Sequence, residues 1–332
     1  MKTGKKLFAV VIFIALPAFL IYIFYSANRD VIVTKQFFSM DTAVRLSAGE
    51  GKIDTYINVI KKLDKALSAY DNNSEIYKLN ENGRLIVSDQ TAELFNSAKK
   101  LSQRYPQINI TAGALTKLWN VTSANPVIPE KNNIEKALNT VDDDNLIING
   151  NKVMLKNNAQ LDLGSCAKGY ALDLLFDEFE KNKENCAVVS FGSSTLLYGE
   201  KSDGKPFTTA VANPEDSNSQ VLKFTSDQCF VSTSGGYERY FEVEGKKYCH
   251  IIDLETGYPV ESDLTSVTVV SAENGLLTDF LSTCVYMGGT KKLDQYLNNS
   301  EYQIIALDKN KRIYCSDSIK ESIEILDNSY CF

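Results

Sequence analysis

Residues 161–173 read LDLGSCAKGYALD and combine a carboxylate, a glycine turn and a lysine. The pattern predicts an apolar strand that ends at Asp162, a small-residue turn, and a helix that opens at Lys168 and Gly169. Free N–H groups at such a turn suit an anion such as a phosphate, although the spacing is not that of a P-loop. Asp162 only accepts hydrogen bonds when ionised, so it suits an N–H-bearing ring, a ribose hydroxyl or a backbone amide.

A second candidate lies in residues 275–289, which are apolar nearly all round and therefore predict a buried helix. Asp279 falls within this helix, and Thr283 follows one turn later on the same face. Burying an ionised carboxylate is costly unless it is paired or bound to a cation. Together the two side chains offer hard oxygens to Mg²⁺. The alternative, an aspartate hydrogen-bonded to backbone, stays equally open.

The chain contains one histidine, His250, which excludes a multi-histidine metal site. A lone histidine beside apolar residues is more often a packed core residue than a catalytic one. Asp253 follows three residues later, ahead of a tight turn, so a functional role stays open. The aromatic side chains of Trp119 and Tyr70 could stack on a ring, although such residues more often belong to the core.

The seven cysteines are scattered and no pair has C-x-x-C spacing, which disfavours a zinc site. We expect mostly buried free thiols, with disulfides as the alternative for an exported chain. A net charge of −7 without a long basic run past the N-terminus argues against nucleic acid as a partner.

The N-terminus predicts a membrane segment. Three lysines precede an uncharged run over 7–25, which is nearly long enough to cross a hydrocarbon core. The cationic flank places the N-terminus in the cytoplasm and the rest of the chain outside. A cleaved signal peptide is the alternative. We therefore expect residues 1–30 to form a single transmembrane helix with its basic tip, and 31–332 to form one extracytoplasmic domain of a single-pass membrane protein.

Hydrophobic periodicity predicts helices and strands that do not alternate regularly along the chain. This order favours an α+β fold with a mixed sheet. The expected helices cover 53–70, 90–104, the end of 108–119, 128–141, 169–182 and 275–289. The expected strands form hairpins over 31–48, over 146–155 with an Asn149-Gly150 turn, and over 186–199; a short strand begins at 108, and strands dominate 207–270.

Nine segments in this order resemble the ApbE family, the FAD:protein FMN transferases, and the resemblance spans about residues 36–290. The segments are MDTAVRL, SAYDNNSEIYKLN, ITAGALTKLW, IEKALNTV, LDLGSCAKGYALD, SFGSSTLLYG, STSGGYERYF, HIIDLETGYPV and TDFLSTCVYMGG.

The resemblance implies an α+β fold that binds FAD with Mg²⁺ and moves FMN onto a Thr or Ser hydroxyl of a partner flavoprotein, releasing AMP. It implies that the partner is an exported electron-transfer protein with a Ser/Thr flavinylation motif. It implies a metal held by Ser165, Asp279 and Thr283, with His250 as base and Asp279 also catalytic. The implied FAD contacts are Met40, Tyr70, Ala114, Leu115, Thr116, Asp162, Lys168, Ile252 and Asp253.

The chain departs from the family pattern in several places. After Gly192 the family usually has a second glycine and then Asn or Asp, whereas this chain has Ser193 and Ser194; Leu254 replaces a proline, and Cys166 replaces an aliphatic residue. Two other functions use the same site. Water as the acceptor would make the chain a Mg²⁺-dependent FAD pyrophosphatase, and no turnover at all would make it a flavin-binding protein.

Overall fold

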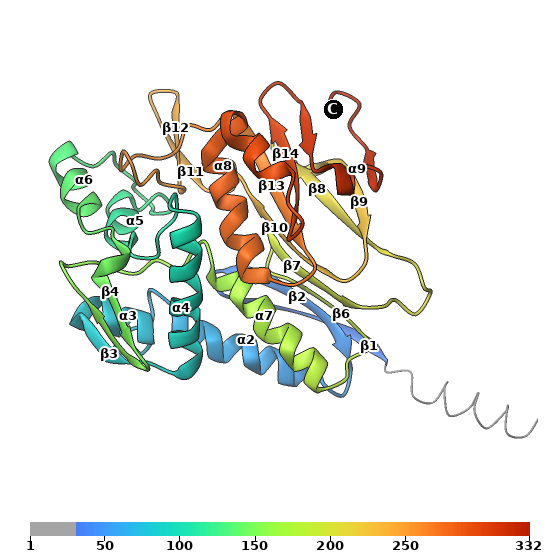
Figure 1. The fold of residues 1–332 in the computed structure, drawn as a ribbon, viewed down its shortest axis with the longest axis horizontal. Coiled ribbons are helices and arrows are strands. Elements are labelled where there is room, and N and C mark those ends of the chain that lie inside the picture. The colour runs from blue at the N-terminus through green and yellow to red at the C-terminus, as the bar shows by residue number, and fades with distance from the viewer. Residues whose placement is uncertain (1–30) are drawn as a thin grey trace, which may run out of the picture.

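The computed structural model describes residues 31–332, and its frame is an eight-stranded antiparallel sheet in the order β1-β2-β6-β7-β10-β13-β14-β15 (Figure 1). The strands are β1 (Ile32–Ser39), β2 (Thr42–Gly49), β6 (Cys186–Ser190), β7 (Ser194–Gly199), β10 (Cys229–Ser234), β13 (Leu264–Ser271), β14 (Gln303–Asp308) and β15 (Ile313–Cys315). β1 is an edge strand with alternating exposure, whereas the central strand β13 is buried almost throughout.

Helices cover one face of this sheet and enclose the main hydrophobic core (Figure 1). They are α2 (Ile53–Leu67), α4 (Asp89–Arg104), α7 (Ala167–Lys181) and α8 (Gly275–Leu297). The apolar stripe predicted for the first of them is buried: Ile53, Ile60 and Leu63 are each at most 2% exposed. The long helix α8 is buried over most of its length, as its all-round apolar sequence predicts.

The opposite face carries a small sheet in the order β16-β9-β8 and a second hydrophobic core. Its strands are β8 (Phe207–Asn213), β9 (Asp216–Ser226) and β16 (Ile323–Ile325), and the short helix α9 (Asp317–Lys320) lies beside them. The domain is thus layered as helices, large sheet and small sheet, which confirms the expected mixed α and β architecture.

Two smaller units complete the fold. A sheet in the order β3-β5-β4 lies near α3 (Glu75–Asn82); its strands are β3 (Arg84–Ile86), β4 (Leu146–Asn149) and β5 (Lys152–Leu155). A third cluster joins α5 (Gly113–Trp119) and α6 (Lys131–Leu138) to the hairpin of β11 (Tyr240–Val243) and β12 (Lys246–Cys249). Trp119 is 1% exposed there and stacks on Tyr248, so it belongs to the core.

The strands expected at 108 and before Asp162 do not form. Each segment is a loop, and the two loops are joined by an isolated bridge between Ala112 and Gln160. The Gly113 N–H donates to the Gln160 carbonyl at 2.8 Å, and the Asp162 N–H donates to the Ile110 carbonyl at 2.8 Å. The apolar residues of both segments are therefore buried through contacts between loops rather than through a strand ladder.

Several predicted boundaries also shift. α2 ends at Leu67 rather than at residue 70, and α8 continues past 289 through a non-helical Gly289. In the β4–β5 hairpin, Asn149 pairs with Lys152, so Gly150 and Asn151 form the loop. Among residues 31–332, no helix is both long and apolar enough to cross a membrane. The predicted anchor lies in residues 1–30, outside the part that the structure describes.

Candidate active site

Asp279 is held between α8, α7 and β7 and is 6% exposed. Its Oδ2 accepts a hydrogen bond from the Gly169 N–H at 3.0 Å, and its Oδ1 accepts one from the Ser194 hydroxyl at 2.9 Å. The sequence left two alternatives for Asp279, a cation ligand or an aspartate bonded to backbone. The bond from the Gly169 N–H shows that it is bonded to backbone. An ionised carboxylate offers about four lone-pair positions, so two hydrogen bonds leave acceptor capacity for a cation.

Two glycines allow the helices to meet at this point. A Cβ on Gly169 would lie 2.3 Å from the carbonyl oxygen of Gly275, and a Cβ on Gly275 would lie 2.7 Å from that of Gly169. Real Cβ atoms do not approach backbone so closely. The glycine after Lys168 therefore serves the close packing of α7 on α8, and this packing brings Asp279 to the start of α7.

Hydroxyl groups line the junction between α8 and β10. The Thr283 hydroxyl donates to the Asp279 carbonyl at 3.4 Å, and its oxygen lies 3.1 Å from Oγ of Ser234. Ser234 also lies 2.8 Å from the hydroxyl of Ser282. Thr283 is half-buried and lies one helical turn after Asp279. Its hydroxyl is a neutral oxygen donor on the same face of α8.

The turn before α7 is organised by Asp162, whose Oδ1 accepts from the Gly164 N–H at 2.7 Å. The Lys168 ammonium reaches the Gly164 carbonyl at 3.5 Å. Cys166 is buried at the N-cap of α7, which begins at Ala167. Asp162, Ser165 and Lys168 are each half-buried, so all three side chains border the surface at the helix start.

His250 stands close to this turn. Its Nδ1 lies 3.2 Å from the Arg239 carbonyl. A carbonyl can only accept, so Nδ1 carries the proton and Nε2 keeps a lone pair. Burial lowers the pKa of His250, and the charges of Arg239 and Lys168 lower it further, while the hydrogen bond to the Arg239 carbonyl and the Asp162 carboxylate oppose them. The imidazole is therefore neutral near pH 7 and able to accept a proton.

The β1–β2 hairpin turn approaches the same region. Met40 and Asp41 both adopt left-handed backbone conformations, with φ of 52° and 57°. Two-residue hairpin loops favour this geometry but usually use Asn and Gly, so the turn is strained. Asp41 pairs with Arg239 at 3.2 Å, which ties the turn to the segment that also positions His250.

The other predicted FAD contacts lie in different surroundings. Tyr70 is 84% exposed in the loop after α2, where its ring is free to stack on a ligand. Leu115 and Ile252 are buried in the core, so they can offer a ligand backbone groups only. Asp253 accepts from the Glu255 N–H and the Thr256 hydroxyl, and so stabilises its own turn.

The first turn of α5 holds the remaining two predicted contacts, Ala114 and Thr116. Both are half-buried. The Thr116 hydroxyl donates to the Gly113 carbonyl at 3.2 Å. Because Gly113 is bonded to Gln160, the start of α5 lies against the loop that leads to Asp162.

Two neighbours of the site, Glu238 and Ser194, are not predictable from the sequence as site residues. Glu238 faces Lys168 and Arg239 and interacts with Asp279. Its only signal was its place in the segment STSGGYERYF. Ser194 was visible as a departure from the family pattern, but nothing in the sequence showed that its hydroxyl bonds Asp279.

The donor set fits Mg²⁺. Within residues 31–332, no group of three or more His, Cys, Asp or Glu side chains is placed to hold a metal ion. Mg²⁺ is commonly held by one or two carboxylates together with substrate phosphates, whereas zinc needs several nitrogen or sulfur ligands. One buried carboxylate, with the Thr283 hydroxyl one helical turn away, matches the former pattern.

The sheets and the helices that cover them make this a mixed α/β protein. Its candidate site lies where the start of α7 meets α8. The chain belongs to the ApbE family, whose model matches residues 40–307. It is 30% identical over 294 residues to a FAD:protein FMN transferase of Klebsiella pneumoniae (strain 342), covering 86% of this chain and 90% of that relative.

Two solved structures share the fold. The ApbE protein of Thermotoga maritima superposes with a TM-score of 0.80 at 27% identity, covering 88% of this chain and 99% of that one. The flavinyl transferase ApbE of Pseudomonas stutzeri, in its apo form, superposes with a TM-score of 0.78 at 25% identity, covering 88% and 97%. The architecture of the family is therefore present over nearly all the described residues.

Proposed function

We propose that this chain, an enzyme of the flavin transferase family, moves FMN from FAD to a Ser or Thr hydroxyl of a partner flavoprotein and releases AMP in a Mg²⁺-dependent reaction. The observation that carries the proposal is the buried Asp279 carboxylate, which accepts from Gly169 at the start of α7, next in sequence to Lys168, whose charge also acts on His250. The names of the curated relatives support the transfer of FMN from FAD.

The residues that would hold the metal are Asp279, Thr283 and Ser165. When bound, Mg²⁺ would neutralise pyrophosphate charge and stabilise the departing AMP. Lys168 supports the same reading. A cation at a helix start is disfavoured by the helix dipole, and an anionic pyrophosphate beside it removes that cost. Asp162 would accept a hydrogen bond from a polar group of the flavin nucleotide.

His250 would act on the incoming hydroxyl. The acceptor oxygen forms a bond to the FMN phosphorus, the P–O bond to AMP breaks, and Nε2 of His250 takes the hydroxyl proton. This role uses the neutral imidazole and the tautomer that the Arg239 carbonyl selects. The acceptor supplies the nucleophile, so no Ser or Cys of this chain has to react.

We expect His250→Gln to lower the rate of FMN transfer by about 10²-fold, the usual size of a general-base contribution. In the unmodified chain the pKa of His250 is lowered, so the base stays neutral as pH falls. The transfer rate should therefore hold steady down to about pH 6.5 and decline only below it. Initial rates measured across this range test the assignment. If the transfer rate of His250→Gln declines at low pH as that of the unmodified chain does, another group is the base.

We also propose that residues 1–30 anchor the chain in the membrane and that 31–332 face outward. The uncharged run behind three lysines supports this orientation. Protease added to intact spheroplasts should then digest the carboxyl-terminal domain, and a domain protected until lysis would contradict the proposal.

The reaction itself is tested with the full-length chain, FAD, Mg²⁺ and an exported flavoprotein carrying a D-x-x-[ST]-[GA]-[ST] segment. We expect AMP and flavin-labelled acceptor in equal amounts. A matched acceptor with its Ser or Thr changed to Ala should yield neither product. AMP and free FMN without labelled acceptor would instead identify a pyrophosphatase, and bound FAD without any product would identify a flavin-binding protein.

A further inference from the structure

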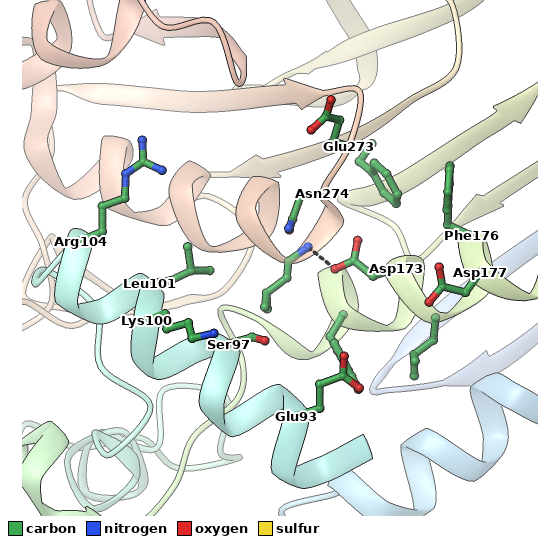
Figure 2. A pocket seen from close by; sticks show the side chains of 14 residues that line it. Glu93, Ser97, Lys100, Leu101, Arg104, Asp173, Phe176, Asp177, Glu273 and Asn274 are labelled. Carbon is green, nitrogen blue, oxygen red and sulfur yellow. Dashed lines mark hydrogen bonds between the residues drawn. The ribbon is translucent and has the colours of Figure 1, made fainter. Parts of the chain in front are cut away.

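A cavity of about 560 Å³ lies between α4, α7 and the start of α8, and none of the predicted site residues lines it (Figure 2). Figure 2 shows Asp173 of α7 at its wall, directed at the first turn of α8. Its Oδ1 accepts from the Gly275 N–H at 2.6 Å, and its Oδ2 accepts from the Leu276 N–H at 2.9 Å. Asp173 therefore occupies the amide groups that an anion in the cavity would otherwise use.

These bonds form one half of a reciprocal contact. Asp173 of α7 accepts from the start of α8, whereas Asp279 of α8 accepts from Gly169 near the start of α7. On each helix the two residues involved are one turn apart, Gly169 with Asp173 and Gly275 with Asp279, so they share a face. The helices run antiparallel here. The carboxylates of Asp173 and Asp279 lie on either side of the contact between Gly169 and Gly275.

The hydrogen bonds of Asp173 and Asp279 fix the register of α7 along α8. A shift of one residue in either direction would remove the carboxylate bonds and drive backbone against backbone where the glycines meet. The bond from the Gly169 N–H to Asp279 depends on the same register, and the Asp279 carboxylate also raises the pKa of Asp173. The position of the Asp279 carboxylate is thus coupled to a residue on the far side of the junction.

Asp173 is also costly to keep as a carboxylate. Burial raises its pKa to about 7, although the N–H groups of Gly275 and Leu276 lower it. The neighbouring Asp177 carboxylate contributes to this increase. Asn274 already caps α8 by accepting from the Leu277 N–H at 2.7 Å. Asp173 satisfies two further N–H groups of this helix start, and it does so from another helix.

We propose that Asp173 is a positioning residue, which locks α7 and α8 in register and thereby holds Asp279 where the transfer reaction needs it. The catalytic part of this inference rests on the proposed function. The structural part, that the Asp279–Gly169 bond depends on Asp173, does not.

The test compares Asp173→Asn with Asn274→Ala, which removes a hydrogen bond from the same helix end without touching α7. Full-length variants are examined by hydrogen–deuterium exchange of the segment over 167–172 and by steady-state FMN transfer. We expect Asp173→Asn to speed exchange there about tenfold and to lower kcat about tenfold, with little change in the KM for FAD. Asn274→Ala should lower the melting temperature but leave both quantities near their original values.

Equal effects of the two variants on exchange and kcat would overturn the inference, because Asp173 would then be only a helix cap. If Asp173→Asn does not fold, Asp173→Glu replaces it, since it keeps the charge and displaces the carboxylate by one methylene. It should show the same pattern at smaller amplitude, and unchanged exchange and kcat would contradict the inference. If the unmodified chain transfers no FMN, the proposed function fails, and the exchange comparison still decides the structural claim.

Discussion

Replacing Asp279 by Asn should lower FMN transfer by about 10³-fold and remove its dependence on Mg²⁺. Asparagine keeps the size of the side chain, and its single carbonyl oxygen can still accept from the Gly169 N–H. It loses the charge that attracts a cation, and its amide nitrogen meets the Ser194 hydroxyl in place of an acceptor oxygen. The fall in the rate of FMN transfer should therefore be larger than any loss of stability could explain.

The measurement is the rate of FMN transfer against Mg²⁺ concentration, with the melting temperature recorded for each variant. Asp308→Asn is a matched control. Asp308 is 4% exposed and accepts the N–H groups of Asn310 and Arg312, both at 2.8 Å, at the end of β14. It should lose stability while keeping full Mg²⁺-dependent turnover. Unchanged turnover in Asp279→Asn would remove this residue from the metal site.

The second large effect is expected from Gly169→Ala. The added methyl group would lie 2.3 Å from the Gly275 carbonyl oxygen and 2.7 Å from Cβ of Asp279, and neither atom belongs to a flexible side-chain end. The helices must move apart, at a cost of about 3 kcal/mol in the free energy of unfolding. Because the same movement breaks the bond to Asp279, transfer should be lost along with stability.

Chemical denaturation and transfer rates test this expectation together. Gly51→Ala is the control, because a Cβ at Gly51 would meet nothing within 4 Å. It should change the free energy of unfolding by no more than about 0.5 kcal/mol. A Gly169→Ala variant as stable and active as this control would mean that α7 and α8 are not held at the close approach described here.

The fold was predictable where local periodicity decides the structure. The stripe over 53–67 and the all-round apolar run from 275 each form the expected buried helix, because a helix with such a pattern can satisfy it only by burial. The segments before Gly113 and Asp162 have the apolar pattern of strands but form loops. Their apolar residues are buried by pairing between two loops distant in sequence, which local pattern does not encode.

The site shows the same division. The burial of Asp279 followed from the helix pattern, but its partners did not, since Gly169 and Ser194 lie 110 and 85 residues away along the chain. Asp173 ends the segment LDLGSCAKGYALD, where a carboxylate on a helix is ordinary until the helix end that it faces is known. Non-local hydrogen bonds thus supplied what residue types and spacing could not.

The most direct test of the central claim is the intact mass of the acceptor flavoprotein after incubation with the full-length chain, FAD and Mg²⁺. We predict that the acceptor gains one FMN less one water, at the Ser or Thr of its acceptor segment, while AMP accumulates in equal amount. An acceptor of unchanged mass, with or without AMP in solution, would contradict the assignment of this chain as a protein FMN transferase.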